Sequence, residues 1–115
     1  MESRAVLRQV IQPVGDIPSA LEFYGALLGL EVRFVDADRY AALDAGGATL
    51  ALAGPEEDVA LVSAPAFKVA DLDGFLERLA AAGGSVVRGL ELGPHERRVV
   101  VGDPWGNRII VYQSH

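Results

Sequence analysis

The sequence predicts an α+β fold built from two βαβββ modules related by internal duplication, with curved mixed sheets that form a cup. The chain has 115 residues, a common length for one domain, and 50% of them are apolar. Strand-like and helix-like segments follow one another in the same order twice. Matching positions lie 55 residues apart, as Asp16 and Asp71 do. We therefore expect a single domain over 1–115, with modules at about 4–53 and 60–113 and a linker at 54–59.

The first module is expected to contain a strand, a helix and three further strands. Asp16 is suited to the N-cap of the helix, Pro18 fits its first turn, and Gly29 ends it near Leu28. Apolar side chains recur there at steps of three and four residues, at Ile17, Ala20, Leu21, Tyr24, Leu27 and Leu28, so one helix face should pack on a sheet. The expected strands cover 4–12, 30–36, 39–45 and 48–53.

The second module repeats this pattern. Its helix begins at Asp71 and ends before Gly83 and Gly84, and its apolar face consists of Leu72, Phe75, Leu76, Leu79 and Ala80. The expected strands cover 60–69, 85–92, 95–101 and 107–113. One such unit is too small to bury both of its faces, so two should share a core or curve around a common cavity.

Composition narrows the possible partners. The net charge is −6 and the basic residues are scattered, which argues against nucleic acid. No apolar run reaches the length of a membrane span, and the lack of cysteine fits a cytoplasmic protein without disulfides or thiolate metal sites. The acidic surface would attract a cationic small molecule, although the same charge can serve solubility alone.

Three segments carry a family resemblance: Val14-Gly15-Asp16, Leu27 to Val32, and Asp103-Pro104-Trp105-Gly106-Asn107-Arg108-Ile109. With the order of elements, they make nearly the whole chain resemble the vicinal oxygen chelate superfamily, which includes glyoxalase I, extradiol dioxygenases and the fosfomycin- and bleomycin-resistance proteins. The closing motif is first of all a turn, in which Asp103 bonds backbone groups and Pro104 fixes φ. The resemblance implies the fold more firmly than the function.

In catalytic members of that superfamily, four positions facing the cavity hold a metal ion. The resemblance places them here at Gln9, Ala51, Ala64 and Ile110, and no His, Asp, Glu or Cys lies within two residues of any of the four. A divalent ion needs several such ligands. We therefore expect neither a metal ion nor another cofactor.

A small apolar cup with one amide suits an organic ligand. Its expected wall residues are Phe34, Tyr40, Leu43, Arg98 and Tyr112, with Asp36, Asp38 and Glu31 as an acidic rim. Trp105 can stack on a ligand, or equally cover a sheet edge or a subunit contact. The alternative is that these are ordinary residues of a collapsed core.

Catalytic candidates are few. They are His95, in a turn beside Glu96, and Arg98, and the sequence has no nucleophile elbow, phosphate-binding glycine loop or metal-binding helix motif. The leading hypothesis is a non-catalytic, metal-independent binder of an aromatic or cationic molecule. Such a binder resembles the bleomycin-resistance branch, which implies a homodimer and possible sequestration of an antibiotic. Alternatives are a metal-free lyase, isomerase or cyclase, a metal-dependent glyoxalase or dioxygenase, and a small partner of a larger enzyme.

Overall fold

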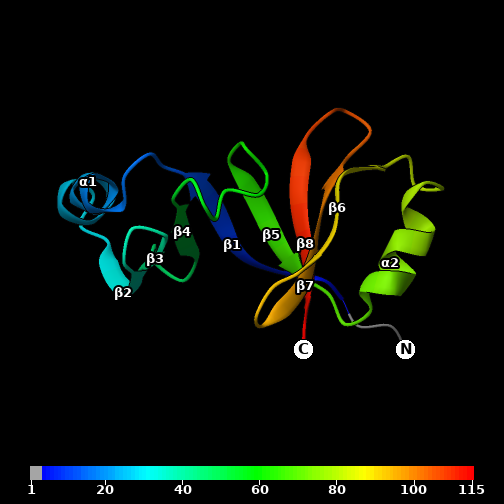
Figure 1. Ribbon diagram of the computed structural model, residues 1–115, viewed down its shortest axis with the longest axis horizontal. Coiled ribbons are helices and arrows are strands. Elements are labelled where there is room, and N and C mark those ends of the chain that lie inside the picture. Colours follow the sequence, from blue (N-terminus) through cyan, green and yellow to red (C-terminus); the bar gives the residue numbers. More distant parts are fainter. Residues whose placement is uncertain (1–3) are drawn as a thin grey trace. The chain divides into compact units, whose positions relative to one another are not determined.

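The computed structural model describes residues 4–115, which form two compact units (Figure 1). One unit is Gln9–Ser63, and the other comprises residues 4–8 with Ala64–His115. Both units contain parallel and antiparallel strand pairs and one helical segment, and the elements follow in the order β, α, β, β, β. The predicted α+β class with two βαβββ modules is confirmed.

The sheet of Gln9–Ser63 has the order β2-β3-β4-β1. Its strands are β1 (Val6–Pro13), β2 (Glu31–Asp36), β3 (Tyr40–Asp44) and β4 (Thr49–Ala53). β1 and β4 run parallel from the pair Gln9 and Thr49 onward, and the other pairs are antiparallel. The strand β2 therefore forms an edge of this unit.

The helix of this unit begins where the sequence predicted. The Asp16 carboxylate accepts a hydrogen bond from the Ser19 N–H at 3.0 Å, and α1 (Ile17–Leu21) follows. The remaining turns differ from the expected regular helix, because η1 (Glu22–Leu27) winds as a π-helix. Apolar spacing of three and four residues does not distinguish these two helix types. Gly29, with φ of 73°, ends the segment.

Only one face of this sheet carries the helix. Its core consists of Ile17, Ala20, Ala41, Leu43 and Leu52, with Val14, Leu21, Tyr24, Leu30 and Leu50 packed against it. Leu43 is fully buried there, so its assignment to the ligand-binding wall was wrong. Successive side chains of a strand point to opposite faces, and Tyr40 therefore lies on the other face, which the helix of this unit leaves uncovered. We call this the open face of the unit.

The second unit has the same architecture. Its strands are β5 (Ala64–Lys68), β6 (Ser85–Leu92), β7 (Glu96–Gly102) and β8 (Arg108–Ser114), in the order β5-β8-β7-β6, with β5 parallel to β8. The helix α2 (Leu72–Leu79) is capped by Asp71, whose carboxylate accepts from the Gly74 N–H at 3.0 Å. It covers one face through Leu72, Val99, Val101 and Val111, with Val69, Phe75, Leu76, Leu79 and Ile109 around them.

The segment before β5 differs from the prediction. A strand was expected from residue 60, but β5 begins at Ala64. Leu61 has a positive φ of 65°, and its N–H donates to the Asp58 carboxylate at 2.9 Å, so the backbone turns there instead of extending. Val59 and Ala60 are buried although they lie outside any strand.

The closing motif is a turn between β7 and β8. The Asp103 carboxylate accepts hydrogen bonds from the backbone N–H groups of Trp105 and Asn107 and from the Asn107 side chain, each at 2.9 Å. These bonds, above all those from Asn107, hold the pKa of Asp103 below its usual value. Gly106 has a φ of 88°, which glycine adopts without strain. The turn predicted from this motif is therefore present.

Within residues 4–115, no helix combines the length and the apolar character that crossing a membrane requires.

Candidate functional site

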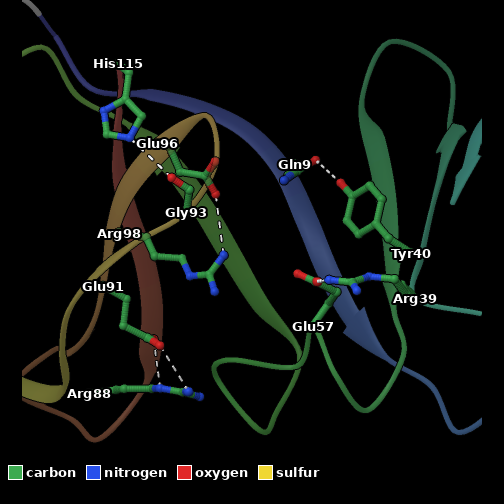
Figure 2. Close-up of polar contacts among 10 residues, drawn as sticks. All are labelled: Gln9, Arg39, Tyr40, Glu57, Arg88, Glu91, Gly93, Glu96, Arg98 and His115. Atoms are coloured by element: carbon green, nitrogen blue, oxygen red, sulfur yellow. Dashed lines mark hydrogen bonds and ion pairs between the residues drawn. The ribbon is translucent and has the colours of Figure 1, made fainter.

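The open face of Gln9–Ser63 carries an aromatic pair joined to an amide. The Tyr40 hydroxyl donates to Gln9 Oε1 at 3.1 Å, and the two side chains point toward each other (Figure 2). The Phe34 and Tyr40 rings have centroids 6.3 Å apart and are tilted by 53°. Phe34 is 56% exposed. An apolar ring beside a phenol therefore remains accessible to a ligand.

A bulge in β2 orients Phe34. In the register with β3, Val32 lies opposite Leu43 and Phe34 opposite Ala42, so β2 holds one extra residue between these pairs. Without the bulge, Val32 and Phe34 would share a face because they are two residues apart. With it, Val32 lies on the helix-covered side and Phe34 joins the open face.

Small side chains form the middle of this face. Ala51 is fully buried and lies opposite Ala42 on β3 and Ile11 on β1. Ala42 and Ala51 have single methyl groups as side chains, whereas the Phe34 ring reaches solvent. Of the predicted ligand-binding residues, the structure thus brings Gln9, Phe34, Tyr40 and Ala51 together within one unit.

Three carboxylates surround Arg39, which precedes Tyr40 in the sequence. The Arg39 guanidinium contacts Glu57 at 2.5 Å, Glu56 at 3.4 Å and Asp36 at 3.8 Å. The hydrogen bond with Glu57 is the main cause that raises the pKa of Arg39. Three carboxylates around one guanidinium leave an excess of negative charge. Each exposed ion pair adds little stability, so the cluster matters mainly through its local potential.

The predicted acidic rim is only partly assembled. Asp36 pairs with Tyr40 in the strand register and belongs to the Arg39 cluster. Asp38 lies in the exposed turn between β2 and β3. Glu31 lies at the opposite end of β2, 3.6 Å from Arg33.

The open face of the second unit is more polar. Arg98 on β7 lies opposite Tyr112 on β8, and its Nη1 lies 3.5 Å from Glu96 Oε2. Ile110 and Ala64, both buried, belong to the same face. This unit therefore brings together the other predicted residues of the cup, Ala64, Arg98, Ile110 and Tyr112.

Burial and a neighbouring cation change the pKa of the Tyr112 phenol in opposite directions. Desolvation raises the pKa of its phenol, while the charge of Arg8 and a hydrogen bond with it act in the opposite direction. The hydroxyl is therefore protonated at neutral pH and can donate a hydrogen bond.

His95 and Trp105 lie on loops. His95 is exposed between β6 and β7, and its backbone carbonyl accepts from the His115 N–H at 3.0 Å. The His115 ring in turn lies 3.3 Å from the Gly93 carbonyl (Figure 2). Trp105 projects from the Asp103 turn and is 83% exposed. Its roles in stacking or in a subunit contact stay predictions.

The residues at the family's metal positions do not fit a metal ion. Ala51, Ala64 and Ile110 have no donor atom, and Gln9 Oε1 already accepts the bond from Tyr40. Across residues 4–115, no three side chains of His, Cys, Asp or Glu form a group that would hold one.

The sequence did not predict the contacts of several charged residues near these faces. Glu56 and Glu57 were assigned to a linker, yet both reach Arg39. The ion pair of Arg88 with Glu91, at 2.9 Å, and the role of Arg8 beside Tyr112 were also missed. The acidic run at 56–58 was the one available signal, because pairs so far apart in sequence leave no spacing pattern.

Comparisons with known proteins agree with this architecture. The family model of the Glyoxalase/Bleomycin resistance protein/Dioxygenase superfamily matches residues 6–111. A protein of Mycolicibacterium smegmatis, described as uncharacterized, is 34% identical over 107 residues and aligns over 92% of this chain and 91% of its own. A member of the same superfamily from Vibrio splendidus 12B01 superposes with a TM-score of 0.73 at 22% identity, covering 96% of this chain and 100% of that one. Methylmalonyl-CoA epimerase from Mycobacterium tuberculosis gives 0.70 at 24% identity, covering 95% and 87%.

Proposed function

Because the chain belongs to the Glyoxalase/Bleomycin resistance protein/Dioxygenase superfamily, we propose that it binds a small organic molecule, without a metal ion, on the open face of Gln9–Ser63. The observation that carries this proposal is the exposed Phe34 ring, set against Tyr40 and next to the acidic cluster around Arg39. The proposal concerns binding and not turnover.

These groups select for an aromatic cation. A flat ring can stack on Phe34 in an offset or edge-to-face arrangement. A quaternary ammonium is attracted by the ring faces of Phe34 and Tyr40 and by the excess carboxylate charge nearby. Sequestration of an antibiotic would be one use of such a surface, as would binding of any other aromatic cation. The cytoplasmic location expected from the sequence stays a prediction.

We predict that benzyltrimethylammonium binds saturably and that EDTA leaves its affinity unchanged. Phe34→Ala should weaken binding about tenfold, since a cation–π contact with its stacking is worth on the order of 1 to 2 kcal/mol. Isothermal titration calorimetry measures both effects.

The matched control is Phe23→Ala, because Phe23 is also exposed, at 55%, but lies on η1. It should bind as the wild type does. Binding that is lost in EDTA, or equal losses in the two variants, would contradict the proposal.

A second candidate is a metal-free isomerase, lyase or cyclase. The observation in its favour is the polar face of the second unit, where Arg98 and Tyr112 present N–H and O–H groups that can stabilise an oxyanion. His95, three residues before Arg98 in the sequence, would then be the candidate for proton transfer. This function predicts turnover that persists in EDTA and disappears in the Arg98→Gln variant. Simple binding predicts no turnover at all.

We also propose a homodimer. The edge strands β2 and β6 expose apolar side chains, and η1 adds more beside β2, where Val32 packs near Gly25. The exposed residues are Phe23, Leu27, Leu28, Val32 and Val35 in one unit and Val86, Val87, Leu90 and Leu92 in the other. Exposed apolar edge strands are normally covered in native proteins, and a second copy would cover them.

The dimer is tested by light scattering coupled to size-exclusion chromatography. The expected mass is twice 12.2 kDa. Val35→Lys, on the β2 edge, should shift the mass toward one chain. A single-chain mass for the wild type at micromolar concentration would contradict the proposal.

A further inference from the structure

Arg98 occupies the middle of the open face of the second unit. Its neighbours on β7, Val99 and Arg97, point to the opposite side, where Val99 packs in the core beneath α2 and Arg97 bonds Asp73 at 2.8 Å. Across the sheet, Arg98 lies opposite Tyr112 on β8 and Glu91 on β6. The Arg98 guanidinium is therefore held on a framework of paired strands.

The hydrogen-bonding capacity of this guanidinium is mostly unused within the part of the chain that the structure describes. Its contact with Glu96 is 3.5 Å long, whereas charge-assisted N–H···O bonds are typically about 2.8 Å. Its Nε is buried and lacks a hydrogen-bond partner among residues 4–115. The side chain as a whole is only 22% exposed, so bulk water does not fully replace the missing acceptors.

The neighbouring charges favour an added acceptor. Glu91 is engaged by Arg88 at 2.9 Å and is thus not the partner of Arg98 (Figure 2). The charge of Arg8 and a hydrogen bond with it lower the pKa of the Tyr112 phenol, against the larger effect of desolvation. Among the residues that the structure describes, Glu96 is the one carboxylate in contact with Arg98, and the contact is long, at 3.5 Å.

We propose that Arg98 and Tyr112 form a subsite for the carboxylate of a small organic molecule, with Glu96 as its internal competitor. The planar fork of an arginine matches the two oxygens of a carboxylate, and the Tyr112 hydroxyl can donate a further bond. This subsite goes beyond the binding proposed above, because it lies in the other unit and selects the opposite charge.

Acetate is the probe, since it has a carboxylate and no ring. Nitrogen-15 NMR at low ionic strength follows the Nε–H signal of Arg98 and the amide of Tyr112 during the titration. Glu96→Gln, which removes the competitor, should tighten acetate binding about fivefold, and Arg98→Gln should weaken it at least tenfold, as expected for loss of a charge-assisted pair.

The matched control is Arg97→Gln, which makes the same charge change on the same strand but on the helix-covered face. It should stay within about twofold of the wild type, because a distant charge acts only through a screened field. Equal weakening by Arg97→Gln and Arg98→Gln, or no tightening by Glu96→Gln, would overturn the subsite. Glu96→Gln keeps the test decisive if Arg98→Gln does not fold.

The experiment is separable from the binding of aromatic cations. Acetate has no ring that could stack on Phe34, and a protein that does not bind acetate can still bind benzyltrimethylammonium. Each proposal therefore fails on its own measurement.

Discussion

Replacing Gly54 by alanine is expected to destabilise the protein by about 3 kcal/mol and to lower its Tm by roughly 10 to 15 °C. The Gly54 N–H donates to the Arg39 carbonyl at 2.8 Å, which ties the segment after β4 to the turn between β2 and β3. A Cβ at this position would lie 2.4 Å from the Asp38 carbonyl oxygen and 3.2 Å from that of Arg39. Both obstacles are backbone, so the side chain cannot be accommodated by a rotamer change.

The same substitution should disturb the proposed cation site. Relief of the overlap requires the segment of Glu56 and Glu57 to move away from Arg39, and the acidic cluster depends on those contacts. A folded Gly54→Ala protein should therefore bind benzyltrimethylammonium more weakly than the wild type.

The control for Gly54→Ala is Gly89→Ala, another glycine-to-alanine change. Gly89 lies in β6 with open space around the position of an added Cβ. It should be neutral or slightly stabilising, because alanine restricts the unfolded chain. Urea denaturation of both variants compares their free energies of unfolding, and a loss below 1 kcal/mol in Gly54→Ala would contradict the overlap.

The local signals in the sequence proved reliable. The caps Asp16 and Asp71 bond the N–H groups of Ser19 and Gly74, as the cap position requires. The strand expected at 85–92 has the same bounds in the structure. Such features depend on residues only a few positions apart, so residue type and spacing are sufficient to predict them.

The direction of side chains in apolar strands was harder to predict. Tyr40, Ala41, Ala42 and Leu43 are all apolar or aromatic, so alternation did not reveal which of them face the helix. Tyr40 and Leu43 are three residues apart and cannot both line the open face of a regular strand, although both were expected to. The bulge that turns Phe34 toward Tyr40 has no signature in the sequence.

The charged groups of the site depend on contacts between distant segments. Arg39 meets Glu57 across 18 positions, and Arg97 meets Asp73 across 24. Periodicity within one element does not encode such pairs, because the path of the backbone between elements decides them. The conformation of Leu61, which delays the start of β5, is another property of that path.

Replacing Leu72 by alanine is expected to destabilise the second unit by about 2 to 5 kcal/mol, the range for a large core side chain that leaves a cavity. Leu72 is fully buried and packs with Val99, Val101 and Val111, while its backbone N–H donates to Gln113 Oε1 at 2.7 Å. That bond persists in alanine and keeps the first turn of α2 anchored to β8, so the surroundings should collapse only partly into the cavity. Leu7→Ala is the control, because Leu7 belongs to the same unit, is 56% exposed and lies outside the proposed dimer surface, so it should change the free energy of unfolding by less than about 0.5 kcal/mol. Urea denaturation measures both, and equal losses would mean that α2 does not cover the core of this unit.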